Sequence, residues 1–281
     1  MRLRGLCLAL VASALLCARC SLLTDTDGLS GGAAPRGDAG GADGSVGADA
    51  AGDAGAEGGG GDAAARGCAR FPDAGFCVDF EGTAPLADGI WNDSDVGSPY
   101  GDISVTSTAS VSPPNAALFD LRSLADAGPC TDLQLRRTFT GTYSSVSAHT
   151  SARIDAYGRF FAFAFSTSST GYRALVSFEA AGDSNKSMVF VLLQKNVGGT
   201  FSDYGSATQA LATSPLGAFH DVWIEYTART PTVTVRVDDV TIPVTADGPM
   251  PIDTPRVYVG PYCRTQPFKV LADDVAVTLR P

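Results

Sequence analysis

Short runs in which apolar and polar residues alternate fill the chain after residue 70, and this pattern constrains the fold more than any other feature. In the run RFFAFAFST (159–167), Phe161, Phe163 and Phe165 fall on one side of an extended chain and smaller residues fall on the other. A period of two is typical of a β-strand with one buried face. No stretch of twelve residues keeps an apolar stripe at helical spacing. The chain is therefore predicted to be all-β.

About ten such runs are separated by turn-forming residues. The runs are GFCVDFE (75–81), DISVTSTAS (102–110), DLQLRRTF (132–139), RFFAFAFST (159–167), YRALVSFEA (172–180), SMVFVLLQK (187–195), DVWIEYTA (221–228), TVTVRV (232–237), RVYVG (256–260) and DDVAVTLRP (273–281). TVTVRV and VTIPV (240–244) are predicted to form a tight hairpin, because Asp238 and Asp239 between them tolerate positive φ. Antiparallel strands joined in this way predict two sheets packed face to face.

The first 66 residues differ from the rest in composition. Arg2 and Arg4 precede an apolar run from Leu6 to Leu16, which is typical of an export signal and too short to span a membrane as a helix. Residues 28–66 are mostly Gly, Ala and Asp and include no aromatic residue, so they cannot bury enough apolar area to fold. We therefore divide the chain into a signal peptide (1–19), an anchor and disordered tether (20–66) and one folded domain (67–281).

The segment CSLLTDTDGLSGG, which begins at Cys20, resembles the start of predicted lipoproteins from myxobacteria and related Gram-negative bacteria. In those proteins the cysteine is acylated and becomes the first residue of the mature chain. The resemblance implies a lipid anchor at Cys20 and, because Ser21 follows it, a location at the outer membrane. The alternative is a secreted or periplasmic protein, with cleavage beside Ala12, Ser13 and Ala14.

The predicted domain holds four of the seven cysteines: Cys68, Cys77, Cys130 and Cys263. An even number in an exported domain favours two disulfides, because the compartment is oxidising. Three pairings are possible. The short separation between Cys68 and Cys77 favours that pair, which leaves Cys130 with Cys263. The alternative is that one or more of the four are buried thiols.

Two segments in the C-terminal half resemble a known fold family. HDVWIEYTARTPTVTVRVDDVTIPV (220–244) and RVYVGPYCRTQPFKVLADDVAVTLRP (256–281) are similar to the concanavalin A-like lectin and glucanase jelly roll, in particular its laminin-G-like branch. In that family the last strand pairs beside the first, a position that FCVDFEG (76–82) fits. The resemblance implies an antiparallel, two-sheet jelly-roll sandwich. Such a resemblance predicts the fold better than the function.

Enzymes of this family place paired carboxylates on one strand, in an E-x-D-x-E signature. The chain has four glutamates, Glu57, Glu81, Glu179 and Glu225, and no two of them share a predicted strand. A turn separates Glu179 from Asp183, and no serine with a nucleophile context accompanies His220 and Asp221. Both arrangements are interpreted as structural. The protein is therefore predicted not to be an enzyme.

The same resemblance implies two kinds of ligand. Laminin-G-like domains often hold one calcium ion at the rim of the sandwich through loop oxygens, and Asp93 and Asp95 are the first candidates here. Aromatic side chains at loops or strand ends can stack on a sugar ring. The candidates for this role are Trp91, Tyr100, Tyr204 and Tyr262. The alternatives are an exposed turn for the carboxylates and a lid over the core for the aromatics.

With a net charge of −10, the sequence shows no basic segment typical of nucleic-acid binding. Our first hypothesis is a non-catalytic surface lipoprotein, attached to the membrane by its lipid anchor, whose jelly roll binds glycans or another envelope component. The second is a structural or protein-interaction component of the cell envelope. The third is a divergent glycoside hydrolase whose carboxylates come from separate strands.

Overall fold

The computed structural model describes residues 67–281 except 83, 88, 123–130, 167–170, 182–185 and 264–265. These residues belong to the second of the two units into which the chain divides, Gly60–Pro281. The predicted signal peptide, the anchor at Cys20 and the tether lie outside the described residues, as does Cys130. Within the described part, no helix has the length and apolar character needed to cross a lipid bilayer.

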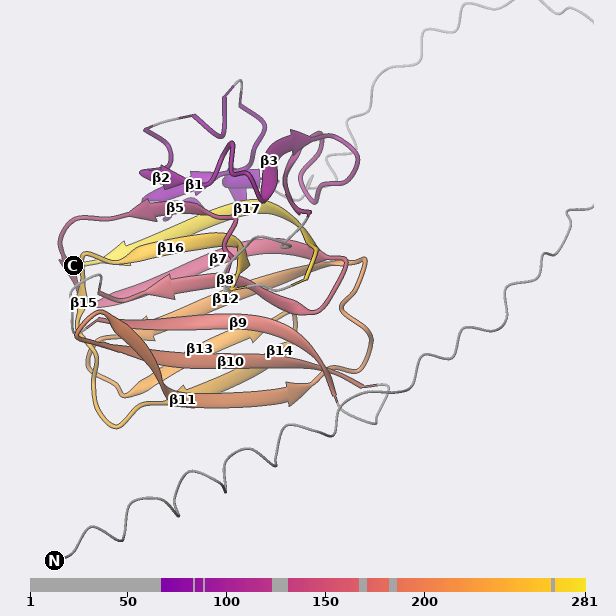
Figure 1. Ribbon diagram of the computed structural model, residues 1–281. Helices are drawn as coiled ribbons and strands as arrows, with labels where there is room; N and C mark the ends of the chain where they lie inside the picture. Colours follow the sequence, from indigo (N-terminus) through magenta and orange to yellow (C-terminus); the bar gives the residue numbers. More distant parts are fainter. Residues whose placement is uncertain are drawn as a thin grey trace, which may run out of the picture. The chain divides into compact units, whose positions relative to one another are not determined.

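Two antiparallel sheets form the domain (Figure 1). In sheet I the strand order is β14, β13, β12, β7, β17, β4 and β3, and β1 also pairs with β17. The strands of sheet I are β14 (Val240–Thr245), β13 (Thr232–Val237), β12 (Phe219–Thr227), β7 (Ser145–Ile154), β17 (Phe268–Arg280), β4 (Ala116–Leu121), β3 (Gly101–Thr106) and β1 (Phe76–Val78).

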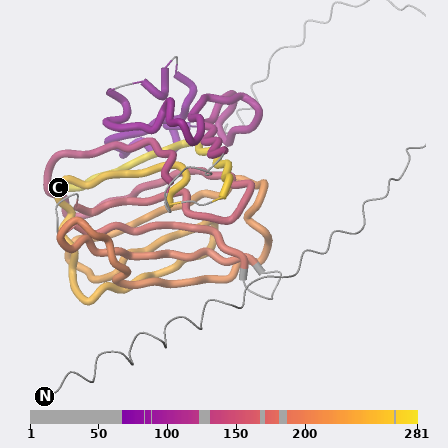
Figure 2. The backbone as a smooth tube through the Cα atoms, viewed as in Figure 1, coloured from indigo at the N-terminus to yellow at the C-terminus, as the bar shows by residue number. Residues whose placement is uncertain are grey.

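In sheet II the order is β11, β10, β9, β8, β16, β5 and β2. The strands of sheet II are β11 (Thr200–Ala210), β10 (Lys186–Val197), β9 (Tyr172–Ala181), β8 (Gly158–Ala164), β16 (Arg256–Tyr262), β5 (Leu135–Thr138) and β2 (Asp93–Ser94). The remaining elements are the two-stranded pair β15 (Ile252–Asp253) and β6 (Thr142–Tyr143) and the 3-10 helix η1 (Gly67–Arg70). The strands of both sheets run in the same general direction across Figure 2, as in an aligned β-sandwich.

The core lies between the two sheets and is built from the apolar side of each strand. Phe161 and Phe163 of β8 in sheet II are fully buried, and Val222 and Ile224 of β12 in sheet I belong to the same cluster. Burying a side chain of this size contributes about 1.5–3 kcal/mol. The period of two in 159–167 therefore predicted the core-facing side of this strand, but the opposite side is buried as well, since Ala162 and Ala164 are each 2% exposed.

The first and last strands of the domain lie side by side, as predicted. Phe76 of β1 pairs with Val277 of β17. The register of β17 shifts between Asp273 and Ala276, where β17 bulges. Before this bulge β17 pairs with β4, and after it with β1. This arrangement confirms the antiparallel jelly-roll sandwich.

The hairpin formed by β13 and β14 is also confirmed. Val237 lies opposite Val240, and Asp238 between them has a φ of 51°. This value falls in the left-handed region, which aspartate tolerates better than most side chains.

Candidate functional site

The side of sheet II that faces away from the core carries a row of polar side chains. Arg173 of β9 lies opposite Gln194 of β10, and Gln194 lies opposite Asp203 of β11. Opposite residues of antiparallel strands project from the same face of a sheet. Tyr262 of β16 joins this group through Arg173. We call Asp203, Gln194, Arg173 and Tyr262 the polar row.

Hydrogen bonds connect the polar row from end to end. Gln194 Nε2 donates to Asp203 Oδ1 over 3.0 Å, and Arg173 Nε donates to Gln194 Oε1 over 2.8 Å. Arg173 Nη2 donates to the hydroxyl of Tyr262. Asp203 is exposed, Arg173 and Tyr262 are half-buried and Gln194 is buried. The row therefore presents both donors and acceptors in a fixed arrangement.

Aromatic rings, rather than a carboxylate, surround the charge of Arg173. Its guanidinium carbon lies 3.6 Å from the centroid of the Phe201 ring and 4.6 Å from that of Tyr262. These distances are within the range of cation–π contacts. In the described part of the chain, Arg173 forms no ion pair. Its charge is thus partly desolvated, and Asp132 interacts with it electrostatically without forming an ion pair.

An apolar floor lies on the same face of sheet II. Ala162, Leu175 and Leu192, from three neighbouring strands, are only 2–3% exposed although they point away from the main core. Phe190, Tyr258 and Tyr262 pack against them. The face therefore combines apolar and aromatic surface with the polar row.

The phenol of Tyr262 is neutral at physiological pH. Burial raises its pKa above the ordinary value of 10.0, and the charge of Asp132 acts in the same direction. Arg173 and Arg159 oppose this shift. Burial also raises the pKa of Asp132, whose Oδ1 accepts a hydrogen bond of 2.8 Å from the Cys263 backbone N–H. Tyr262 therefore keeps its hydroxyl proton and can donate it to an acceptor.

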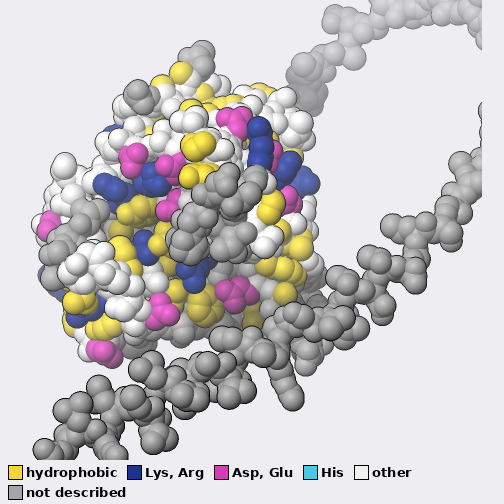
Figure 3. Space-filling view, viewed as in Figure 1, with side chains coloured by type: hydrophobic (Ala, Val, Ile, Leu, Met, Phe, Trp, Pro, Cys, Tyr) yellow, Lys and Arg dark blue, Asp and Glu magenta, His cyan; other side chains and the backbone are white. Residues whose placement is uncertain are grey.

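A pocket of about 400 Å³ adjoins Tyr262. This volume falls within the roughly 300–1,000 Å³ of small-molecule sites. The pocket is lined by Tyr157, Gly158, Arg159, Phe178, Glu179, Ala180, Tyr262 and Cys263. Figure 3, drawn from the same side as Figure 1, shows basic, acidic and hydrophobic side chains close together on the visible surface.

Of the four aromatic residues predicted to stack on sugars, Tyr262 is the one that joins the polar row. Trp91 is 3% exposed, and its Nε1 donates to the Pro85 carbonyl over 3.0 Å, so the prediction for Trp91 was wrong. Tyr100 is half-buried against the core. Tyr204 follows Asp203 in β11 and therefore points to the opposite face, where it packs against the core. The centroids of the Tyr204 and Tyr172 rings are 5.5 Å apart.

The carboxylates predicted to bind calcium contact an arginine instead. Arg136 lies opposite Asp93 in the register of β5 and β2. Its guanidinium is 3.2 Å from Asp93 and 2.8 Å from Asp95. The described residues include no group of three or more potential metal ligands. Because Arg136 neutralises both carboxylates, the structure does not support a calcium site at Asp93 and Asp95.

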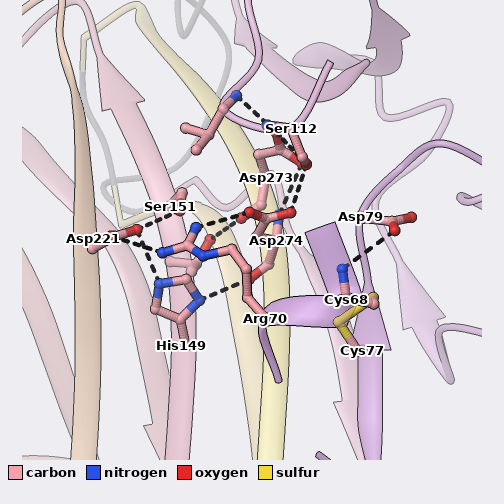
Figure 4. A network of polar contacts seen from close by, with 12 residues as sticks. Cys68, Arg70, Cys77, Asp79, Ser112, His149, Ser151, Asp221, Asp273 and Asp274 are labelled. Carbon is pink, nitrogen blue, oxygen red and sulfur yellow. Dashed lines mark hydrogen bonds and ion pairs between the residues drawn. A yellow bond between two sulfur atoms is a disulfide. The ribbon is translucent and has the colours of Figure 1, made fainter. Parts of the chain in front are cut away.

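A second polar network lies on sheet I, around His149, Ser151 and Asp221 (Figure 4). Ser151 Oγ donates to Asp221 Oδ1 over 2.6 Å, and His149 Nε2 is 3.1 Å from the same oxygen. The pKa of Asp221 is held well below its usual range, first by His149 and then by Ser151 and Arg70, against the effect of burial.

This trio of residue types does not form a catalytic triad. In a triad the serine hydroxyl bonds to the imidazole that takes its proton, whereas Ser151 bonds to the carboxylate. His149 is fully buried, and its ring packs against Phe71 and Trp223 at 4.7 and 4.3 Å between centroids. His220, the neighbour of Asp221 in sequence, contacts Asp238 instead. The interpretation of this region as structural is retained.

The same network continues into a pair of buried carboxylates at the bulge of β17. Asp273 accepts hydrogen bonds from the backbone N–H groups of Val111 and Ser112 at 2.9 and 3.0 Å. Burial raises the pKa of Asp273 to about 6, and the charge of Asp274 adds to the shift. Ser112 Oγ donates to Asp274 over 2.6 Å.

A disulfide secures the segment that supplies Arg70 to this network. Cys68 and Cys77 are bonded, as their short separation favoured, and the bond connects η1 with β1. Cys263 is also disulfide-bonded. The partner predicted for it, Cys130, lies outside the described residues.

The sequence matches no known family model and no curated protein. Among solved structures, the endo-beta-1,4-glucuronan lyase from the fungus Trichoderma reesei is similar, with a TM-score of 0.52 and 13% identity over 73% of this chain and 95% of that chain. A beta-glucanase from Bacillus licheniformis has a TM-score of 0.46 and 12% identity over 73% of this chain and 98% of that chain. A homodimeric agglutinin from chicken liver has a TM-score of 0.33 and 18% identity over 49% of this chain and 98% of that chain.

Identities this low are evidence for the fold alone. The class of the protein is therefore an antiparallel jelly-roll sandwich.

Proposed function

We propose that this domain is a non-catalytic glycan-binding module and that the outer face of sheet II binds the glycan. The observation that carries the proposal is the polar row beside the apolar floor. A sugar presents hydroxyl groups around its ring and C–H groups on its faces. Ligand sites that recognise such a molecule combine a few fixed polar groups with apolar and aromatic surface.

The fold comparison supports a glycan as the ligand. The lyase from Trichoderma reesei, which has a TM-score of 0.52, is named for the glycan glucuronan. The agreement concerns the class of ligand, a polysaccharide. The residues that bind it are proposed from the structure of this chain.

Glu179 and Asp203 are too far apart to form a hydrolytic pair. Glu179 lies six residues along β9 from Arg173, and Arg173 is level with Asp203 across the sheet. Six residues of strand span about 20 Å. Paired carboxylates that cleave a glycosidic bond lie about 5–9.5 Å apart. Glu179 and Asp203 therefore cannot act as such a pair.

We further propose that a lipid anchor at Cys20 holds the domain at the outer membrane. The support is the text of the sequence around Cys20 and the apolar run before it. Several acyl chains give a durable anchor, because each buried methylene adds about 0.8 kcal/mol. Glycans or other components of the envelope would then be within reach of the domain.

A glycan array tests the binding function. The full chain, produced with its disulfides and kept in detergent, is expected to bind saccharides. Tyr262→Phe, which removes one hydroxyl, and Gln194→Ala are expected to weaken that binding. Tyr204→Phe is the matched control, because Tyr204 packs against the core instead of joining the polar row.

Two results would count against the proposal. No binding across a broad array would overturn the glycan-binding function and favour a structural or protein-interaction role. Release of new reducing ends from a bound polysaccharide would overturn the non-catalytic assignment and favour a divergent carbohydrate-active enzyme.

A further inference from the structure

Four arginines project from the outer face of sheet II: Arg136, Arg159, Arg173 and Arg256. They come from β5, β8, β9 and β16, and the strand register places them on the same face as Tyr258 and Leu175. The chain as a whole carries a net charge of −10. This face therefore brings four guanidinium groups together on a protein that is otherwise acidic.

Three of these four arginines have no carboxylate partner among the described residues. Arg136 is paired with Asp93 and Asp95. Arg173 bonds to the neutral groups of Gln194 and Tyr262, and Arg256 Nε donates to Thr138 Oγ1 over 2.6 Å. No ion pair or hydrogen bond of the Arg159 guanidinium occurs in the described part of the chain.

The acidic groups on this face are engaged with other donors. Asp203 accepts from Gln194, Asp132 accepts from the Cys263 backbone and Glu179 accepts from Ser177 Oγ over 3.2 Å. Among the described residues, none of these carboxylates forms an ion pair with Arg159, Arg173 or Arg256, so the three guanidinium groups keep N–H donors for an anion. Because all three are half-buried, an anion placed beside them would be less screened by water than at an open surface.

Tyr262 brings two of the arginines into one site. Arg173 donates to the Tyr262 hydroxyl, and Arg159 pairs with Tyr262 in the register of β8 and β16. Arg159 and Tyr262 also line the same pocket of about 400 Å³. A guanidinium can bind a carboxylate through two parallel N–H donors, which gives both strength and orientation.

We propose that the ligand of this face is an anionic polysaccharide whose carboxylate groups bind Arg159 and Arg173. This inference rests on the proposed glycan-binding function and names the class of glycan. The half-buried rings of Phe190 and Tyr258, which pack on the apolar floor, contact the sugar rings, and the two arginines select chains that carry uronate residues.

A matched pair of polymers tests the inference. Binding of the full chain to polygalacturonate is compared with binding to the same polymer after its carboxyl groups have been reduced to alcohols. We expect the acidic polymer to bind about tenfold tighter or better, because each charge-assisted hydrogen bond contributes about twice as much as a neutral one. Its binding is expected to weaken as salt is raised.

Variants of the arginines test whether the preference for the acidic polymer depends on the outer face of sheet II. Arg159→Ala and Arg173→Ala are each expected to lower affinity for the acidic polymer about tenfold while affecting the reduced polymer less. Arg159→Gln and Arg173→Lys are milder second variants, since the first keeps polarity and the second keeps charge without the planar fork. Arg229→Ala is the matched control, because Arg229 is exposed between β12 and β13 in sheet I. Far-ultraviolet circular dichroism verifies the folding of each variant.

The outcomes separate this inference from the function on which it rests. Equal binding of both polymers, lowered equally by the variants, would overturn the anionic preference and leave glycan binding in place. Preference for the acidic polymer without any effect of Arg159→Ala or Arg173→Ala would overturn the assignment to these residues. Preference for dextran sulfate over polygalacturonate would replace the carboxylate by a sulfate ester. Absence of binding to every polymer would overturn both proposals.

Discussion

The guanidinium of Arg70 lies 3.1 Å from the carboxylate of Asp221 and 3.0 Å from that of Asp274. One side chain near the start of the domain thus contacts β12 and β17, two strands that come much later in the sequence. Phe71, the next residue, packs on His149. Arg70 and Phe71 therefore lie over His149 on sheet I, and the network of Figure 4 holds them in place.

Removal of Arg70 is expected to destabilise the domain. Asp274 is fully buried, and Arg70→Ala would leave its carboxylate without a counter-charge. Breaking a fully buried pair costs about 3–5 kcal/mol, and we expect about 2–3 kcal/mol here because Arg70 itself is partly exposed. Urea denaturation of the full chain measures the loss. Arg122→Ala, which removes an exposed pair, is expected to cost less than about 1 kcal/mol, and equal losses would contradict the prediction.

Asp273 is expected to make the domain less stable as the pH rises from 4 to 7. Its pKa is raised from 3.8 to about 6 in the folded state, so the folded protein holds this proton more tightly than the unfolded chain. The stabilisation is complete below about pH 4 and is lost as the pH passes 6, with a total of about 2–3 kcal/mol.

The Asp273→Asn variant isolates this contribution. We compare the unfolding free energies of the wild type and the variant at several pH values. Between pH 4 and pH 7 the wild type is expected to lose stability relative to the variant. A constant difference would contradict the prediction. Asp221 does not contribute to the change in stability between pH 4 and pH 7. Its pKa is lowered, so its stabilisation is lost only when the pH falls below about 4.

Trp91 is expected to affect stability and not glycan binding. Its ring is buried against Phe76, with ring centroids 5.4 Å apart. Trp91→Ala should cost about 3–5 kcal/mol, as is typical of large-to-small changes in a core. Trp91→Phe is the milder variant for the binding measurement, where we expect unchanged affinity for any glycan that the wild type binds. Weaker binding by a fully folded Trp91→Phe would show that Trp91 does contribute to the site.

Cys20→Ala is expected to abolish the lipid anchor. Labelled palmitate should be incorporated into the full-length wild type and not into the variant, because acylation requires the cysteine thiol. The Cys17→Ala variant serves as the control and should remain labelled. Equal labelling of wild type and Cys20→Ala, or none in either, would favour ordinary secretion.

The alternation of apolar and polar residues predicted the strands that bury one side against the core. It failed for strands whose burial or sequence does not alternate in this way. The edge strand β11 is exposed over most of its length and carries no alternation that a period of two would reveal. In β4 the burial does alternate, but consecutive alanines hide the pattern in the sequence. Asp238, in contrast, identified its hairpin because the turn needs a residue that accepts positive φ.

The candidate site was harder to predict because its residues meet only through the strand register. Arg173 lies 21 positions from Gln194 and 89 positions from Tyr262. No local motif connects them. The sequence marks Tyr262 as an aromatic residue at a strand end, whereas nothing in the sequence around Arg173 indicates that it lies beside Gln194 and Asp203. Trp91 shows the opposite error, since the sequence does not reveal which way a loop residue points.

The position of β17 has a consequence for the order of assembly. This strand contacts β7 on one side and β4 and β1 on the other, and it follows all three in the chain. Sheet I therefore lacks its central member until Phe268–Arg280 has been synthesised. Until then β7, β4 and β1 have unpaired edges. A chain that ends before Phe268 is therefore expected to aggregate through these edges instead of forming a smaller stable domain.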